Sequence, residues 1–287
     1  MKTPFIKFFG IVIIAGFLLT SCDSTITYPP VADTPTGVYH PGQIVWHDLA
    51  SPNPSISMEF YSKVFGWEFN TLGSGETGYH VILQNGKPIG GIFKLADKYG
   101  NVGEWVSSIS VEDVDAAVKY NETQGGKTVF KTSHFKGRGK TALVQDPQGA
   151  MVAFIYADGG DPGFSEAKVN TWLWNELWTT DTEASLNYYR GLFGFAEKSI
   201  LGSKVPYFVF EKDKKKYSGL LGNPVEGARS AWMPYVRVTD VNATMEKAKN
   251  AGAHIMMEPD KDIRKGSVAV ILDPLGAQFT IQKWPVN

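Results

Sequence analysis

An internal repeat constrains the fold of this chain more than any other feature of its sequence. Residues 44–69 return, altered but recognisable, as residues 173–198, at an offset of about 128 residues. Both copies open with tryptophan, any residue, an acidic residue and leucine. Each then carries an aromatic pair and a Phe-Gly-aromatic ending: Phe60-Tyr61 and Phe65-Gly66-Trp67 in the first, Tyr188-Tyr189 and Phe193-Gly194-Phe195 in the second. We therefore expect two copies of one structural unit.

The repeat extends well beyond these two segments. Matching residues recur at nearly the same offset along both halves: Gly91 with Gly219, Trp105 with Trp232, Asp113 with Asp240, and Asp146-Pro147 with Asp273-Pro274. Within each half, the pattern of a strand, a helix and three further strands is predicted twice in succession. The sequence therefore predicts four β-α-β-β-β units, two in each half.

The first unit shows how each unit is expected to form. Residues 44–49 alternate as a strand, which places Trp46 and Asp48 on one face and His47 on the other. Asn53 is expected to cap the following helix and Gly66 to end it. The buried stripe of this helix is predicted to carry Ile56, Phe60 and Val64; that of its copy, capped by Asp181, is predicted to carry Ala184, Tyr188 and Leu192.

Composition excludes some classes of partner. The chain has 287 residues, of which 43% are hydrophobic and 20% are charged, as is typical of globular proteins. The chain has a formal net charge of -1, whereas nucleic-acid-binding proteins usually carry an excess of basic residues. We therefore expect no nucleic-acid partner. The sequence contains no P-loop, dinucleotide fingerprint or nucleophile-elbow motif.

The N-terminus has the pattern of a targeting segment. Residues 8–19 are apolar and uncharged, and they are too few to span a bilayer, which takes about 20 residues. Residues 19–22, Leu-Thr-Ser-Cys, resemble the lipobox of bacterial lipoproteins. That resemblance implies a signal peptide over residues 1–21 and a lipid, such as palmitate, on Cys22. The alternative is an ordinary secretory signal with an incidental cysteine.

A lipidated Cys22 would place the protein in the bacterial cell envelope, anchored to a membrane with its domain outside the cytoplasm. Residues 22–42 contain four prolines and no apolar periodicity, so they are predicted to form an extended tether. Cys22 is the only cysteine, which leaves no internal disulfide.

The repeat, the aromatic helix ends and the Asp-Pro-x-Gly-Ala turns together resemble the vicinal oxygen chelate superfamily of glyoxalases, bleomycin resistance proteins and extradiol dioxygenases. The resemblance implies an α+β fold with tandem glyoxalase-like domains, in which four βαβββ units form curved mixed sheets with concave clefts. The implied domains are residues 43–157 and 170–287, joined by a linker over residues 158–169. Since the two halves can pair within one chain, a monomer is sufficient and a homodimer is possible.

Enzymes of this superfamily usually hold a divalent metal with His and Glu side chains on the concave sheet faces. By the resemblance, the ligand positions fall on side chains that are poor ligands: Trp46, Ile82, Val106 and Ala153 in the first half, and Trp174, Phe210, Met233 and Thr280 in the second. We therefore expect no metal and no cofactor. His47, next to one such position, is expected to face away and to be structural.

Two acidic residues are the candidates for catalysis. Asp48 and Glu176 share a sheet face with Trp46 and Trp174, and a carboxylate in a partly dry cleft suits a general base. The alternative is a structural role at the strand ends. Five residues are predicted to bind a ligand: Trp46, His80, Trp174, Met233 and Tyr235. Four of these residues and Trp172 are expected to lie together, as either an aromatic pocket or an aromatic core. The four are Trp46, Trp174, Met233 and Tyr235.

A basic loop is the remaining candidate. It holds His134, Lys136, Arg138 and Lys140, with Gly137 and Gly139 among them. The loop either gates a pocket mouth or binds an anion, or it is simply solvated.

Three hypotheses for function follow. The first is an envelope lipoprotein that binds a small organic ligand without a divalent metal. The second is a metal-independent lyase or isomerase that uses Asp48 or Glu176 as its general base. The third is a protein-interaction scaffold in the envelope. The first two require an open aromatic pocket beside an acidic residue, and the third is favoured where a cleft is filled by its own side chains.

Overall fold

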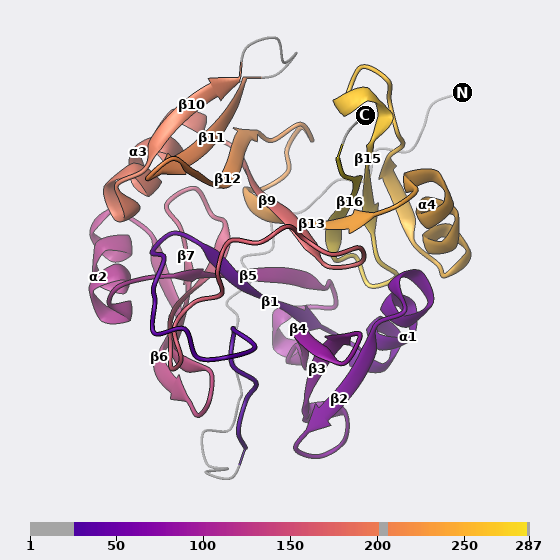
Figure 1. Ribbon diagram of the computed structural model, residues 1–287, viewed down its shortest axis with the longest axis horizontal. Coiled ribbons are helices and arrows are strands. Elements are labelled where there is room, and N and C mark those ends of the chain that lie inside the picture. The colour runs from indigo at the N-terminus through magenta and orange to yellow at the C-terminus, as the bar shows by residue number, and fades with distance from the viewer. Residues whose placement is uncertain (1–25, 201–205, 286–287) are drawn as a thin grey trace.

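The computed structural model describes residues 26–200 and 206–285 of the chain (Figure 1). Each half contains one eight-stranded sheet and two α-helices. The first half comprises β1 (Ile44–Ser51), α1 (Pro54–Phe65), β2 (Glu68–Leu72), η1 (Gly75–Thr77), β3 (Tyr79–Gln84), β4 (Lys87–Lys94), η2 (Asp97–Tyr99), β5 (Glu104–Ser110), α2 (Val114–Thr123), β6 (Lys127–Phe135), β7 (Gly139–Gln145) and β8 (Met151–Ala157). The second comprises β9 (Trp172–Thr179), α3 (Thr182–Phe193), β10 (Ala196–Ile200), β11 (Tyr207–Lys212), β12 (Lys215–Gly222), β13 (Ala231–Val238), α4 (Val241–Asn250), β14 (His254–Met257), η3 (Arg264–Gly266), β15 (Val268–Leu272) and β16 (Gln278–Lys283).

The two sheets have the same strand order, which confirms the predicted α+β fold. The first runs β2-β3-β4-β1-β5-β8-β7-β6, and the second runs β10-β11-β12-β9-β13-β16-β15-β14. Within each unit the first and last strands pair in parallel, as β1 pairs with β4. The two units of a half join through an antiparallel pair, β1 with β5 and β9 with β13.

The predicted helix caps are confirmed. The Asn53 side chain accepts a hydrogen bond from the Ile56 amide, and Gly66 ends α1 in the left-handed conformation that glycine adopts most readily. The predicted buried stripe of α1 is partly wrong, because Ile56 is 41% exposed. The buried face instead includes Pro54 and Ser57 in the first turns and continues through Phe60 and Val64.

The helices pack between the two sheets, so the halves share their cores. In Figure 1, α1 lies beside α4, and α2 lies on the same side of the molecule as α3. One core joins Phe60 and Tyr61 of α1 to Val241 and Met245 of α4. The other joins α2 to α3 and includes Tyr189. The halves therefore pair within the chain.

A pair of hydrogen bonds related by the repeat locks this arrangement. The Tyr61 hydroxyl donates to Asp273 over 3.1 Å, and the Tyr189 hydroxyl donates to Asp146 over 2.8 Å. Each tyrosine belongs to the aromatic pair of one half, and each aspartate to the Asp-Pro turn of the other. The two sequence motifs that mark the repeat therefore bind each other across the interface.

The segment before β1 differs from the expected tether. It is extended, but Val31 and Ala32 are buried against the first half. The Tyr28 amide donates to the Lys136 carbonyl over 2.9 Å, and Lys87 forms an ion pair with Asp33. We call residues 26–33 the strap. A proline-rich segment need not be free when it carries a few apolar side chains that can dock.

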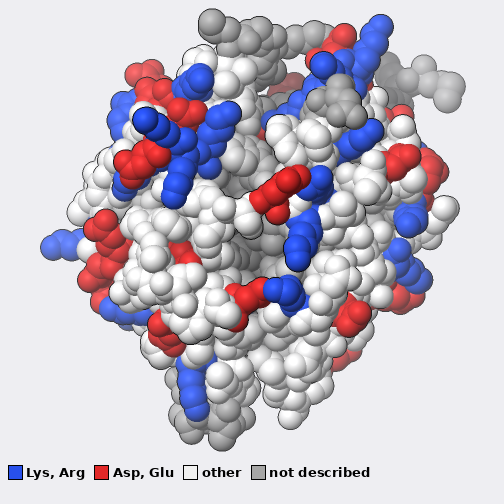
Figure 2. All heavy atoms as spheres, in the orientation of Figure 1, with Lys and Arg blue, Asp and Glu red and all other residues white. Residues whose placement is uncertain are grey.

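Residues 1–21 and Cys22 lie outside the described residues. Within the described part of the chain, no helix is both long and apolar enough to cross a membrane. On the face shown in Figure 2, Lys and Arg side chains are interspersed with Asp and Glu.

Candidate functional site

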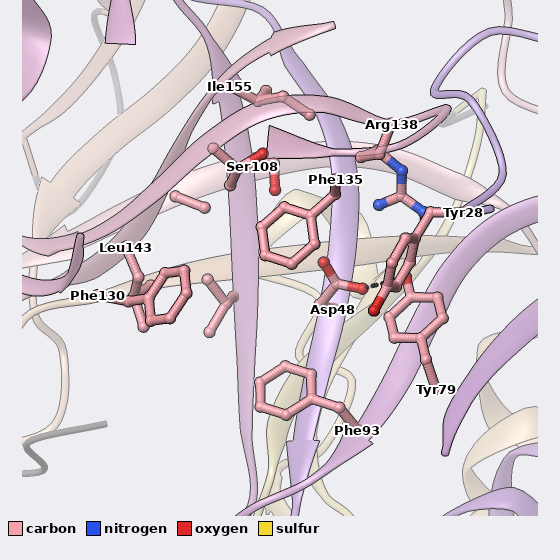
Figure 3. Close-up of a pocket in the computed structure, with 13 residues that line it drawn as sticks. Tyr28, Asp48, Tyr79, Phe93, Ser108, Phe130, Phe135, Arg138, Leu143 and Ile155 are labelled. Atoms are coloured by element: carbon pink, nitrogen blue, oxygen red, sulfur yellow. Dashed lines mark hydrogen bonds between the residues drawn. The ribbon is translucent and has the colours of Figure 1, made fainter. Parts of the chain in front are cut away.

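A pocket lies on the first sheet, on the face that points away from the helices. It encloses about 590 Å³ of empty space, which includes the part that opens to solvent. Its walls are largely aromatic and aliphatic, and they come from seven strands, the strap and the loop between β6 and β7 (Figure 3). The lining residues are Tyr28, Asp48, Tyr79, Phe93, Val106, Ser108, Phe130, Phe135, Arg138, Thr141, Leu143, Ala153 and Ile155. This is the character of a small-molecule site.

Asp48 presents the acidic group of the pocket. Its Oδ1 accepts hydrogen bonds from the Tyr79 hydroxyl over 2.6 Å and from the Trp46 indole over 3.0 Å. Among the described residues, no hydrogen bond or ion pair reaches Oδ2. The carboxylate lies deep in the protein, yet part of it stays accessible from the pocket. One oxygen is therefore held in place, and the other is available to a ligand.

A glycine makes this arrangement possible. Gly91 lies directly across from Asp48 on β4. A Cβ atom at this position would lie 2.0 Å from the Tyr79 hydroxyl and 2.7 Å from Asp48 Oδ1. The repeat places Gly219 at the corresponding point of the second half, where a Cβ atom would lie 2.2 Å from the Tyr207 hydroxyl. Both halves thus need glycine where a tyrosine meets a carboxylate.

The surroundings of Asp48 change its acidity. Burial raises the pKa of the Asp48 carboxyl above its usual value, because it disfavours the charged form. The nearby Arg138 charge and the hydrogen bonds from Tyr79 and Trp46 oppose that rise. A carboxylate with a raised pKa and a free oxygen is suited to accept a proton or a hydrogen bond.

Arg138 contributes the basic group of the pocket. The sequence left open whether its loop gates a pocket or is simply solvated; the Arg138 side chain is buried and lines the pocket. Its Nη2 donates to the Tyr79 hydroxyl over 3.3 Å, and its guanidinium lies 3.8 Å from the Trp46 ring centroid. Among the described residues, no ion pair links it to Asp48.

The second half carries the same kinds of residue in a closed arrangement. Glu176 is 1% exposed, and both of its carboxylate oxygens are occupied. Oε1 accepts from the Tyr207 hydroxyl over 2.7 Å and pairs with Arg264, while Oε2 accepts from Tyr235 and, over 3.3 Å, from Trp178. Glu176 therefore has no free oxygen, and the geometry favours Asp48 over Glu176 as a ligand-facing group.

Two substitutions between the halves explain why one cleft is open and the other is filled. Ser108 lies across from Trp46 on β5, and Tyr235 lies across from Trp174 on β13. The repeat likewise places Ala50 in the first half where the second has Trp178. Small side chains thus leave the first cleft open, and two large aromatic ones fill the second.

The predicted ligand-binding residues do not form one pocket. Trp46 lies beside the open pocket, whereas Trp174, Met233 and Tyr235 pack together in the second cleft. Trp172 is in neither: it stacks on His47 with ring centroids 4.2 Å apart. The pairing of β9 with β13 is irregular near this residue, which breaks the simple alternation used in the prediction.

His80 was expected to face the pocket, and the structure corrects this orientation. It pairs with Ile92, which packs against the helices with Leu49, on the face opposite to Asp48. Its Nδ1 lies 2.9 Å from the Thr71 hydroxyl. Ile82 shares that face, so it was also the wrong residue for a middle-strand ligand position.

His47 lies at the interface between the halves, on the face away from Trp46 as expected. It is 3% exposed, and its Nε2 lies 2.8 Å from Asn175 Oδ1. Burial lowers the pKa of His47 to about 4, because the charged imidazole would lose its hydration.

The side chains on these faces do not form a metal-binding set. Among the described residues, no three His, Cys, Asp or Glu side chains come together. In the open pocket, the residue across from Asp48 on β5 is Val106. The residue at the expected ligand position of the final strand, β8, is Ala153. A single carboxylate among aromatic walls does not fit a divalent cation, which needs three or four protein ligands.

Comparison with known proteins places this geometry in context. A family model described as "Glyoxalase/Bleomycin resistance protein/Dioxygenase superfamily" matches residues 43–154 and 172–281. The "Putative glyoxylase CFP32" of Mycobacterium tuberculosis is 28% identical over 250 residues, which are 85% of this chain and 96% of that protein. The anthracycline biosynthesis protein DnrV of Streptomyces peucetius is 28% identical over 259 residues, covering 85% and 94%.

Solved structures show the same fold at lower identity. The Mn(II)-bound glyoxalase from Novosphingobium aromaticivorans aligns with a TM-score of 0.57 and 14% identity, over 85% of this chain and 83% of that one. Homoprotocatechuate 2,3-dioxygenase from Arthrobacter globiformis aligns with a TM-score of 0.59 and 17% identity, over 90% and 84%. At this identity the likeness concerns the fold alone.

Proposed function

Because the chain belongs to the glyoxalase/bleomycin resistance protein/dioxygenase superfamily, we propose that it binds a small organic ligand in the pocket of its first half. We also propose that a lipid on Cys22 holds it in a bacterial cell envelope. The side chains present do not fit the divalent metal of the family's metal-bound members. Binding is therefore assigned to the pocket's own side chains.

The free oxygen of Asp48 carries the proposal. Its neighbours use Oδ1 and leave Oδ2 without a protein partner among the described residues, beside an apolar cavity. The apolar walls lower the local dielectric around Oδ2, so a ligand that donates to this oxygen gains more than the same contact would give in water.

The walls indicate the chemistry of the ligand. Phe93, Phe130 and Phe135 give the pocket aromatic surfaces that favour a flat, apolar body. Asp48 favours a hydroxyl or N–H donor on that body, and Arg138 can contact an acceptor on it. One of the relatives, DnrV, is named as an anthracycline biosynthesis protein, and this name supports a polycyclic aromatic ligand.

A binding experiment tests this proposal. The chain would be titrated with a panel of flat hydroxylated aromatic compounds, and binding would be followed by calorimetry. Ser108→Tyr copies the residue that fills the second cleft, so this variant should lose binding while keeping its melting temperature. Ser199→Tyr, at an exposed position on β10 of the second half, is the matched control. Equal binding by wild type and Ser108→Tyr would place the ligand elsewhere.

A metal-independent enzyme is the second candidate, and the raised pKa of Asp48 favours it. In this reading Oδ2 takes a proton from a carbon or hydroxyl of the substrate, and Arg138 stabilises the negative charge that results. Turnover of the same panel by wild type and by Asp48→Asn separates the two candidates. An enzyme loses turnover in Asp48→Asn, whereas a binder shows no turnover in either form.

A further inference from the structure

The arginines of the two halves occupy corresponding loops and behave differently. Arg138 lies between β6 and β7, and Arg264 lies between β14 and β15. Arg264 reaches its carboxylate, Glu176, and closes the second cleft. Arg138 does not reach Asp48; its Nε donates instead to the Pro29 carbonyl over 2.7 Å. The first cleft is thus open partly because its arginine is bound elsewhere.

The acceptor for Arg138 belongs to the strap. Pro29 is fixed by its neighbours, since the Tyr28 amide bonds to Lys136 and Val31 packs against Trp46. In Figure 3, Tyr28 lies next to Arg138 and Tyr79 at the edge of the pocket. Its ring meets that of Tyr79 edge-on, with centroids 5.2 Å apart, and that of Phe135 with centroids 5.4 Å apart.

We propose that the strap is part of the ligand site: Tyr28 forms a wall that contacts the ligand, and the Pro29 carbonyl holds Arg138 away from Asp48. This inference rests on the proposed function, because it concerns the same pocket. In the second half, the described hydrogen-bond partners of the Arg264 side chain are the side chains of Glu176 and Gln282, and neither is a backbone carbonyl from a docked segment.

The physical reason lies in the cost of burying an unpaired charge. Arg138 is 6% exposed, so its guanidinium needs acceptors within the protein. If the strap leaves, the Pro29 carbonyl leaves with it, and Oδ2 of Asp48 becomes the strongest acceptor nearby. Arg138 then pairs with Asp48 as Arg264 pairs with Glu176, and the pocket loses both a wall and its free oxygen.

Tyr28→Ala in the full chain tests the wall, with Tyr39→Ala as the matched control. Tyr39 belongs to the same N-terminal segment but stacks on Tyr156, outside the pocket. The probe is 2-naphthol, a flat fluorescent compound with one hydroxyl donor. We expect its affinity to fall at least about tenfold in Tyr28→Ala, a loss of about 1.4 kcal/mol, and to be unchanged in Tyr39→Ala. Equal affinities in the two variants would overturn the proposal.

Tyr28→Ala with Val31→Asp removes the docked ring and places a charge where Val31 packs with Trp46, so this variant should release the strap. If Arg138 closes the pocket once the strap is lost, adding Arg138→Met to this variant should make it bind 2-naphthol more tightly. Equal binding with and without Arg138→Met would contradict the positioning role.

A second readout needs no ligand. The pKa of Asp48, which faces Arg138, Tyr79 and Tyr28, can be followed through its carboxyl ¹³C signal. It should fall in Tyr28→Ala with Val31→Asp, as Arg138 approaches, and an unchanged pKa would also overturn the positioning role. If wild type binds neither 2-naphthol nor the wider panel, the proposed function fails, while this titration still decides whether the strap positions Arg138.

Discussion

Arg264 forms an ion pair with Glu176, whereas Arg138, its counterpart in the first half, leaves Asp48 unpaired. Both clefts contain the same four kinds of side chain: an indole, a carboxylate, a tyrosine and an arginine. Among the described residues, the carboxylate of the first cleft keeps an oxygen without a protein partner beside an empty space, and that of the second does not. The proposed function therefore assigns the ligand site to the first half and a structural role to the second cleft.

Gly91→Ala should lower the stability of the protein and displace the Tyr79 and Asp48 side chains of the open pocket. The added methyl group would collide with the Tyr79 hydroxyl and Asp48 Oδ1, which lie 2.0 and 2.7 Å from the Cβ position. Overpacking of this kind costs about 1–3 kcal/mol of unfolding free energy. Gly163→Ala is the control, because nothing lies within 4 Å of its Cβ position. Chemical denaturation of both variants measures the effect; equal stability would show that Tyr79 and Asp48 can move apart freely.

His47 should make the stability of the protein depend on pH. Its pKa falls from about 6.5 in the unfolded chain to about 4 in the folded protein, so the unfolded state binds the proton more tightly. The stabilisation is complete above pH 6.5 and is lost as the pH falls towards 4, by about 3 kcal/mol at about 1.4 kcal/mol per pH unit.

Comparison with His47→Asn isolates this contribution, because several buried carboxyls also titrate at low pH. Asparagine is the residue that the second half carries at the same point, Asn175. The difference in unfolding free energy between the two proteins should shrink or reverse between pH 6.5 and pH 4. A difference that stays constant over this range would contradict the neutral state assigned to the buried His47.

Arg264→Met should destabilise the second half strongly. Glu176 is 1% exposed, and without Arg264 its charge would be buried without compensation. Breaking one side of a buried ion pair costs about 3–5 kcal/mol. The double variant Arg264→Met with Glu176→Gln should recover much of that loss, because no charge is left behind. If the single variant is as stable as wild type by thermal unfolding, the pair is not structural.

Cys22→Ser tests the envelope proposal. Wild type expressed in bacteria should incorporate radioactive palmitate and sediment with membranes, and the variant should do neither. Unlabelled wild type would remove the lipoprotein assignment and leave the pocket proposal intact.

Much of the fold was predictable because the repeat supplies its own evidence. Each cap, turn and strand in one half has a partner in the other, and the family resemblance stated from these motifs is confirmed by the family match. The alternation of β1 also placed Trp46 and Asp48 correctly on one face. These features depend on local pattern, which the sequence carries directly.

The site was less predictable because it depends on contacts between distant segments. β3 is buried on both faces, so alternation alone did not show which face His80 takes. Arg138 lies in a loop whose sequence is typical of a solvated loop, but its side chain is buried among the strap, Trp46 and Tyr79. Two comparisons between the aligned halves, Ser108 with Tyr235 and Ala50 with Trp178, are the sequence signals that would have distinguished the open cleft from the closed one.

A crystallographic fragment screen with small hydroxylated aromatic compounds tests the central claim most directly. The claim predicts that bound fragments gather in the first-half pocket, with a donor within hydrogen-bonding distance of Asp48 Oδ2, and that the cleft around Glu176 and Arg264 stays closed. Fragments that bind in the second cleft while the first pocket remains empty would contradict it.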